Sequence, residues 1–147
     1  MVENNIRLRV IGQLDRLPAE VREALDQTMA ATKEQTGMNL ILALSYGGRA
    51  EIVRMVREVA EKIKRGTIDP QAVNEGLVSD HLYTRDIPDP DLLIRTSGEM
   101  RISNFLLWQI AYTELFVTST LWPDFSKEEL LQILKDFQVR VRRFGTV

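Results

Sequence analysis

Two hydrophobic periods alternate along the chain. Period-two or continuous apolar runs at 6–11 (IRLRVI), 40–44 (LILAL), 92–94 and 115–117 predict four strands. Apolar residues spaced three and four apart predict four main helices: one opened by Leu17-Pro18 and ended by Gly37, one ended by Gly66, one over 105–112, and one begun by the capping sequence at 126–129. Strands that alternate with helices predict an α/β fold with a mainly parallel sheet of four strands flanked by helices.

Chain length and strand character refine this picture. A chain of 147 residues predicts a single domain over 1–147. The continuous apolar run at 40–44 is typical of a strand that is covered on both faces, as in parallel sheets. Four strands are few for this class, and the first strand begins almost at residue 1. We therefore expect that part of the fold precedes Met1.

The segments between these elements contain further local signals. Asp69-Pro70 and Ser79-Asp80 each predict the cap of a short helix. The prolines at 88 and 90 make the segment 86–91 a stiff connector. Its aspartates resemble a metal cluster, but the prolines prevent a helix that would present them together, so we interpret them as a solvated linker.

Composition narrows the function classes. The net charge is −2 and both signs are mixed, which argues against a nucleic-acid surface. Cysteine is absent, which excludes disulfides, thiolate metal sites and cysteine nucleophiles. The N-terminus lacks a signal-peptide pattern, and no apolar run approaches membrane-spanning length. These features predict a cytoplasmic protein.

Two arginines frame a Ser-Gly turn after the third predicted strand. Arg95 ends that strand, Arg101 precedes the helix predicted at 105–112, and Ser103 is a natural N-cap for it. A diphosphate needs several charge-assisted donors from different directions, which two guanidiniums, a hydroxyl and a helix N-terminus supply. The alternative is that Ser103 only caps the helix while both arginines are solvated.

Other candidate positions carry weaker signals. The glycines of 46–49 (YGGR) precede a helix and either approach an anion or form a tight turn. Glu114 is either a magnesium ligand or a surface charge beside a strand. His81 is the single histidine and has no evident catalytic partner, so a structural position is the simpler interpretation.

The segment 94–115 (IRTSGEMRISNFLLWQIAYTEL), followed by LWPDF, resembles the C-terminal signature of cis-prenyltransferases of the bacterial undecaprenyl diphosphate synthase type. LSYGGRAEI and the terminal RRFG resemble two further blocks of that family. The resemblance covers nearly the whole chain, in the right order. It implies condensation of isopentenyl diphosphate onto an allylic diphosphate, usually farnesyl diphosphate, to build a Z-polyprenyl (undecaprenyl) diphosphate, the cell-wall lipid carrier.

The resemblance also implies roles for individual residues. The isopentenyl diphosphate site would comprise Arg95, Arg101, Ile102 and Ser103. Glu114 would be linked to Mg²⁺. Arg143 and Gly145 belong to a tail that reaches across a homodimer toward the partner's diphosphate. A peripheral membrane contact would arise only through the product.

The family pattern begins before this chain does. The Asp-Gly-Asn-Gly-Arg loop that holds the allylic diphosphate and the essential aspartate has no counterpart among the 147 residues. We therefore expect this chain to supply the isopentenyl diphosphate half-site and no catalytic aspartate. The alternatives are a non-catalytic partner subunit and an inactive fragment.

Overall fold

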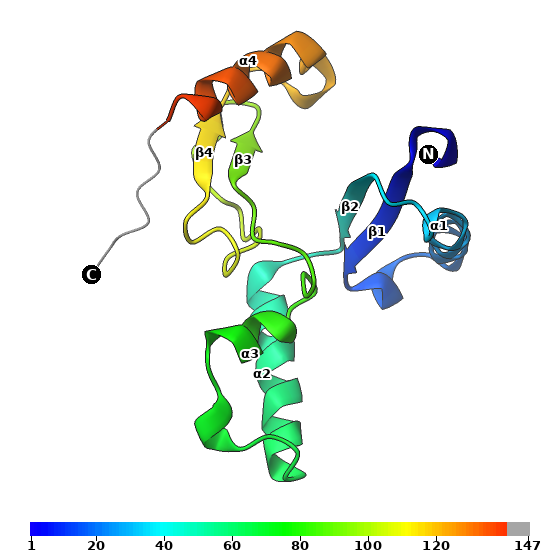
Figure 1. Ribbon diagram of the computed structural model, residues 1–147, viewed down its shortest axis with the longest axis vertical. Helices are drawn as coiled ribbons and strands as arrows, with labels where there is room; N and C mark the ends of the chain where they lie inside the picture. The colour runs from blue at the N-terminus through cyan, green and yellow to red at the C-terminus, as the bar shows by residue number, and fades with distance from the viewer. Residues whose placement is uncertain (141–147) are drawn as a thin grey trace. The chain divides into compact units, whose positions relative to one another are not determined.

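The structure, a computed structural model, describes residues 1–140 and divides into two compact units, Met1–Ile87 and Pro88–Val147 (Figure 1). Each unit contains one two-stranded parallel sheet with helices. The predicted α/β class and the four parallel strands are confirmed. Within the units, hydrogen bonds join β1 with β2 and β3 with β4, and the arrangement of all four strands in one sheet stays a prediction. The single domain over 1–147 stays a prediction.

The sheet of the first unit pairs β1 (Ile6–Gly12) with β2 (Met38–Leu44). The register runs from Ile6 beside Met38 to Gly12 beside Leu44. Helix α1 (Ala19–Thr32) makes the crossover between the strands and packs on β1. Its buried Thr32 hydroxyl accepts from the Leu8 backbone N–H at 3.1 Å. The prediction that β2 is covered on both faces is wrong for its first half, because residues 38–40 are exposed.

Gly12 is required where β1 ends. Its φ is +118°, and a Cβ there would lie 2.0 Å from the backbone oxygen of Leu44. Any side chain at this position would push the ends of the two strands apart. The glycine therefore keeps the end of β1 close to the loop that leads from β2 into the next helix.

Helices α2 (Gly48–Lys64) and α3 (Glu75–Asp80) complete the first unit. The buried stripe of α2 is Glu51, Met55 and Val59, spaced four apart, whereas Val53 and Val56 are exposed. The 3-10 turn at Pro70–Ala72 is capped by Asp69 as predicted. The cap predicted at Ser79-Asp80 is wrong: Asn74 caps α3 by accepting from the Leu77 N–H at 2.9 Å, and 79–80 end the helix.

The second unit pairs β3 (Leu92–Arg95) with β4 (Glu114–Val117) and adds α4 (Lys127–Gln138). Leu92 lies beside Glu114 and Arg95 beside Val117. Ser126 caps α4 as predicted, because its hydroxyl accepts from the Glu129 N–H at 3.1 Å. The helix buries Ile133, while Leu130 and Leu134 on the same face remain more than a third exposed.

The helix predicted over 105–112 is absent, and residues 103–113 form a succession of turns. Ser103, Asn104 and Leu106 all have positive φ, between 45° and 62°. A right-handed helix cannot begin through residues in the left-handed region, because their carbonyls point the wrong way to accept helical hydrogen bonds. Ser103 therefore caps nothing, and this frees its hydroxyl for another contact.

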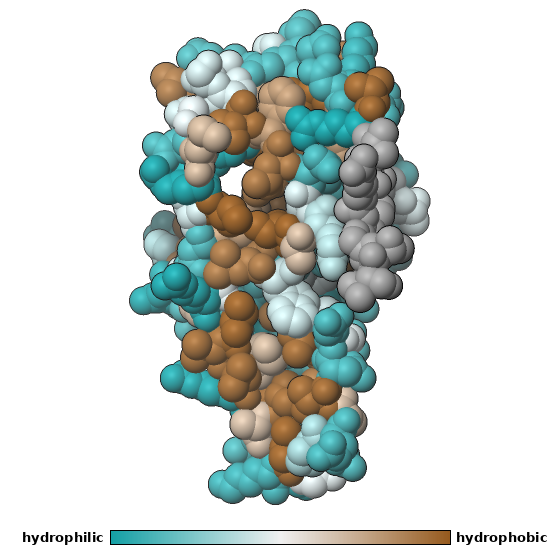
Figure 2. All heavy atoms as spheres, turned by 90° about the vertical axis from the view of Figure 1, so that its left-hand side faces the viewer, coloured by the Kyte–Doolittle hydropathy of each residue, from teal (hydrophilic) through white to brown (hydrophobic). Residues whose placement is uncertain are grey.

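Large apolar side chains remain at the surface of both units, as the brown patches of Figure 2 illustrate. In the second unit they include Leu115 and Val117 of β4 and Leu131 of α4, which are 50%, 38% and 46% exposed. Within residues 1–140 no helix is long and apolar enough to span a bilayer.

Glu58 on α2 gives the first unit a testable dependence on pH. Lys62 donates to it at 2.9 Å and Arg54 at 3.0 Å, and the hydrogen bond from Lys62 is the main cause that lowers its pKa below 4.5. A lowered folded-state pKa adds stability above the unfolded value, and that stability is lost as pH falls through the folded value.

We expect Glu58→Gln to lower the free energy of unfolding by less than about 1 kcal/mol at pH 7, because the pair is partly exposed. The difference from wild type should shrink below pH 4.5. Urea unfolding at several pH values between neutral and strongly acidic measures both quantities. A difference that is constant with pH would contradict the prediction.

Candidate functional site

A tight turn follows β3 and holds the first predicted anion ligand in place. Ser97 and Gly98 both have positive φ, 68° and 66°. Their N–H groups donate to the carbonyls of Thr120 and Thr118, each at 2.8 Å. The turn is thereby fixed to the segment that follows β4, so Arg95 at the end of β3 projects from a supported position. Ligands of open parallel sheets bind at this carboxyl edge.

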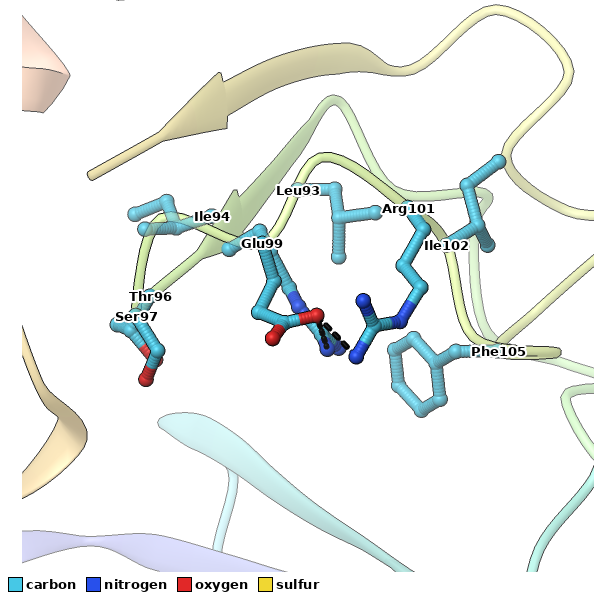
Figure 3. Close-up of a pocket in the computed structure, with 9 residues that line it drawn as sticks. Leu93, Ile94, Thr96, Ser97, Glu99, Arg101, Ile102 and Phe105 are labelled. Carbon is cyan, nitrogen blue, oxygen red and sulfur yellow. Dashed lines mark ion pairs between the residues drawn. The ribbon is translucent and has the colours of Figure 1, made fainter. Parts of the chain in front are cut away.

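Arg95 and Arg101 converge on a single oxygen atom. Glu99 Oε2 lies 3.8 Å from Arg95 Nη2 and also forms an ion pair with Arg101 Nη2. Figure 3 shows the dashed ion pairs that leave the Glu99 carboxylate, one of them reaching Arg101. Ser103 joins the group, because its hydroxyl accepts from Arg95 Nη2 at 3.4 Å. The turn at 96–100 thus brings together residues that are up to eight positions apart.

Arg95, Glu99 and Arg101 line a cavity of about 550 Å³ at the end of β3 (Figure 3). Besides Arg95, Glu99 and Arg101 the lining comprises Leu93, Ile94, Thr96, Ser97, Ile102 and Phe105. A second cavity of about 510 Å³ shares the two arginines and Glu99, and its remaining walls are apolar: Leu93, Met100, Ile102, Leu115, Phe116 and Val117. A charged head and an apolar tail could therefore be held side by side.

Four of the predicted site residues are thus brought together. Arg95, Arg101 and Ile102 line the same cavity, and Ser103 contacts Arg95. The helix N-terminus that was expected to contribute N–H donors is not formed, so the donors of this cluster are two guanidiniums and one hydroxyl. Sequence reasoning missed Glu99. The available signal was an acid placed between two arginines that were already suspected of binding an anion.

Glu114 lies apart from this cluster. It begins β4, at the end of the strand opposite to Val117, and Val117 is the residue that pairs with Arg95. Its Oε2 accepts from Arg140 Nη1 at 2.9 Å, and the same nitrogen donates to the Leu115 carbonyl at 3.3 Å. Residues 1–140 contain no group of three or more metal-ligating side chains. Magnesium bound together with a diphosphate needs only one or two protein carboxylates, and Glu114 offers one.

The loop 46–49 in the first unit leads into α2 through an extended Gly47 and a buried Gly48. Tyr46 donates its hydroxyl proton to Glu51 Oε2 at 2.6 Å, and Glu51 Oε1 accepts from the Tyr83 N–H at 2.6 Å. Glu51 is 2% exposed and was not singled out from the sequence. A signal existed: Glu51 precedes Met55 and Val59 by four and eight residues, which places an acid on the apolar stripe.

His81 occupies a structural position, as its interpretation from sequence proposed. The ring is half-buried at the end of α3, with Nδ1 at 2.7 Å from the Leu77 carbonyl and Nε2 at 2.8 Å from Lys62 Nζ. Both ring nitrogens are therefore engaged. Arg143 and Gly145, predicted to contact a partner's diphosphate, lie outside the described residues.

Comparison with known proteins assigns the family. A family profile described as "Putative undecaprenyl diphosphate synthase" matches residues 1–145. The chain belongs to this family. The resemblance seen at 94–115 is thereby confirmed, and with it the assignment to a transferase family.

Named relatives and solved structures agree with this assignment. An isoprenyl transferase of Porphyromonas gingivalis is 52% identical over 145 residues, which cover 99% of this chain and 57% of the relative. One from Bacillus cereus is 52% identical over 147 residues, again 57% of the relative. The chain thus spans little more than half the length of these relatives.

Two solved structures share the fold. A lavandulyl diphosphate synthase from Lavandula x intermedia, solved in complex with dimethylallyl diphosphate, matches with a TM-score of 0.92 and 40% identity over 96% of this chain and 61% of that one. A probable undecaprenyl diphosphate synthase from Campylobacter jejuni matches with a TM-score of 0.85 and 38% identity over 99% and 66%.

Proposed function

We propose that this chain supplies the isopentenyl diphosphate half-site of a cis-prenyltransferase. The reaction would add isopentenyl diphosphate to an allylic diphosphate such as farnesyl diphosphate and extend a Z-polyprenyl (undecaprenyl) chain. The observation that carries the proposal is the shared oxygen of Glu99: two guanidiniums already meet at one anionic oxygen. A diphosphate oxygen at that point would receive charge-assisted hydrogen bonds from both.

The residues of the cluster would bind and orient the substrate. Guanidiniums present paired N–H groups that match phosphate oxygens, and Ser103 adds a hydroxyl beside Arg95. With the diphosphate held there, the apolar walls at Leu93, Ile102 and Leu115 would receive the five-carbon group. Holding the reacting carbon in one place lowers the entropic part of the barrier when an allylic partner arrives.

We also propose Glu114 as a carboxylate ligand of magnesium, an ion that would neutralise charge on diphosphate oxygens. Because Glu114 lies at the end of the β3–β4 pair opposite to Arg95, an ion that it holds would lie apart from the arginine cluster of the same chain. To bind the ion, Glu114 would either share its carboxylate between the ion and Arg140 or break its ion pair with Arg140. The homodimer contacts of Arg143 and Gly145, the cytoplasmic location and the lipid-carrier product stay predictions.

The activity test is incorporation of labelled isopentenyl diphosphate with farnesyl diphosphate and Mg²⁺, using the purified chain alone. We expect isopentenyl diphosphate to bind but not to be incorporated, because one half-site cannot align two substrates. Incorporation by the chain alone would contradict the half-site proposal. Absence of both binding and incorporation would favour the alternative of a non-catalytic partner subunit or an inactive fragment, and co-purification with a full-length synthase would then separate those two.

A further inference from the structure

Glu99 occupies the place at which the two arginines of the anion site meet. Its Oε2 atom forms ion pairs with both guanidiniums. The side chain is 33% exposed, compared with 35% for Arg95 and 67% for Arg101. In Figure 3 the carboxylate points into the cavity and not away from it. The position that an external anion would take is therefore filled by an anion that the chain itself provides.

The charges of the cluster make the two occupants mutually exclusive. Two guanidiniums and one carboxylate leave a net charge of about +1, whereas the arginines alone would give +2. A diphosphate that reached the arginines with Glu99 still in place would bring its own negative oxygens against the carboxylate. Like charges at contact distance in a partly desolvated site are strongly unfavourable. One of the two anions has to leave.

We propose that Glu99 is a tethered counterion that competes with diphosphate for Arg95 and Arg101 and swings out of the cavity when diphosphate binds. This inference rests on the proposed function, because it takes the same cavity to be a diphosphate site. The tether has two effects. It keeps two like-charged guanidiniums together while the site is empty, and it raises the apparent dissociation constant of every external anion.

The size of the competition follows from the fraction of molecules whose arginines are free. The apparent dissociation constant equals the intrinsic value divided by that fraction. Partly exposed ion pairs of this kind are each worth little, and two of them together hold the carboxylate in place for most of the time. We therefore expect Glu99 to weaken diphosphate binding by about fivefold.

The test is calorimetric titration of the 147-residue chain with inorganic pyrophosphate, with a chelator present so that no cation can bridge ligand and carboxylate. Glu99→Gln keeps the shape of the side chain and removes its charge. We expect this variant to bind pyrophosphate about fivefold more tightly than wild type. The matched control is Glu61→Gln, which removes a carboxylate from the exposed Arg65 pair of α2 and alters the net charge equally. It should leave the affinity unchanged.

Each outcome decides a different question. Tighter binding by Glu99→Gln alone supports the tethered counterion. Binding by the variant in the absence of detectable binding by wild type also supports it, while it contradicts the proposed function of the unmodified chain. Equal or weaker binding by the variant overturns the inference but leaves the diphosphate site standing. If neither protein binds pyrophosphate, both proposals are wrong.

Discussion

Arg101→Ala is expected to weaken isopentenyl diphosphate binding by roughly 2 kcal/mol, which is about 30-fold in the dissociation constant. Arg101 forms an ion pair with Glu99 Oε2, so its guanidinium lies where a diphosphate oxygen would be held. Alanine removes the charge-assisted hydrogen bonds and the positive charge together. Isothermal titration of the purified chain with isopentenyl diphosphate measures the effect.

A matched control separates site chemistry from net charge. Arg65 is 69% exposed and ion-paired with Glu61, much as Arg101 is 67% exposed and paired with Glu99. Arg65→Ala should leave the affinity within twofold of wild type. Arg95→Lys should also weaken binding of isopentenyl diphosphate, because an ammonium group cannot form paired contacts to phosphate. If Arg101→Ala and Arg65→Ala behave alike, the assignment of the arginine pair fails.

Glu51→Ala is expected to destabilise the first unit by about 3 kcal/mol. This is a larger change in free energy than the one expected for binding by Arg101→Ala. Glu51 is almost fully buried and accepts from two donors on separate segments, the Tyr46 hydroxyl and the Tyr83 N–H. Its removal leaves the Tyr83 N–H without this partner and opens a gap in the stripe with Met55 and Val59. The loop after β2 would also lose its attachment to α2.

Urea unfolding and hydrogen exchange test this expectation together. The free energy of unfolding should fall, and the Tyr83 amide should exchange faster than in wild type. Tyr46→Phe removes the hydroxyl donor, keeps the Tyr83 N–H donor and should cost about 1 kcal/mol. Glu61→Ala, an exposed acid on the same helix, should cost less than about 0.5 kcal/mol. A Glu51→Ala protein as stable as the Glu61→Ala protein would contradict the role assigned to Glu51.

Sequence reasoning succeeded wherever the local signal and the tertiary structure agree. The alternating run at 6–11 and the apolar run at 40–44 became paired parallel strands. The capping sequence at 126–129 became a helix start with the predicted hydrogen bond. In these segments propensity, periodicity and capping chemistry all favour the same state, which is the condition under which a pattern is decisive.

The failures share a different cause. Residues 105–112 have helical composition, but the left-handed backbone at Ser103, Asn104 and Leu106 turns the chain where the helix should begin. The hydrophobic periodicity does not predict these positive φ angles, because the angles depend on contacts with other parts of the unit. Within α4, Ile133 is buried while Leu130 and Leu134 on the same apolar face stay more than a third exposed. Periodicity identifies the apolar face of a helix but not how deeply each residue on it is buried.

The site itself was predicted in part. Arg95, Arg101 and Ser103 were expected to converge, and they do so through a turn and a carboxylate where a helix N-terminus had been expected. Pairing of Glu99 with both arginines could not be deduced from spacing alone, because β3 ends at Arg95 and neither position 99 nor position 101 lies in a helix or strand. The pairing depends on the reversal at Ser97 and Gly98.

The parallel pairing of both sheets also sets how fast this chain can fold. Neither sheet contains a hairpin: β1 must meet β2 across a separation of 32 residues, as Ile6 pairs with Met38, and β3 must meet β4 across 22, as Leu92 pairs with Glu114. Pairings this distant carry a large loop-closure cost before any strand contact offsets it, so folding should be slow for a chain of this size. During synthesis β1 and β3 each leave the ribosome well before their partners, and their backbone edges stay open in the meantime. We therefore expect the yield of folded protein to depend more on temperature and rate of synthesis than on the stability of the finished structure.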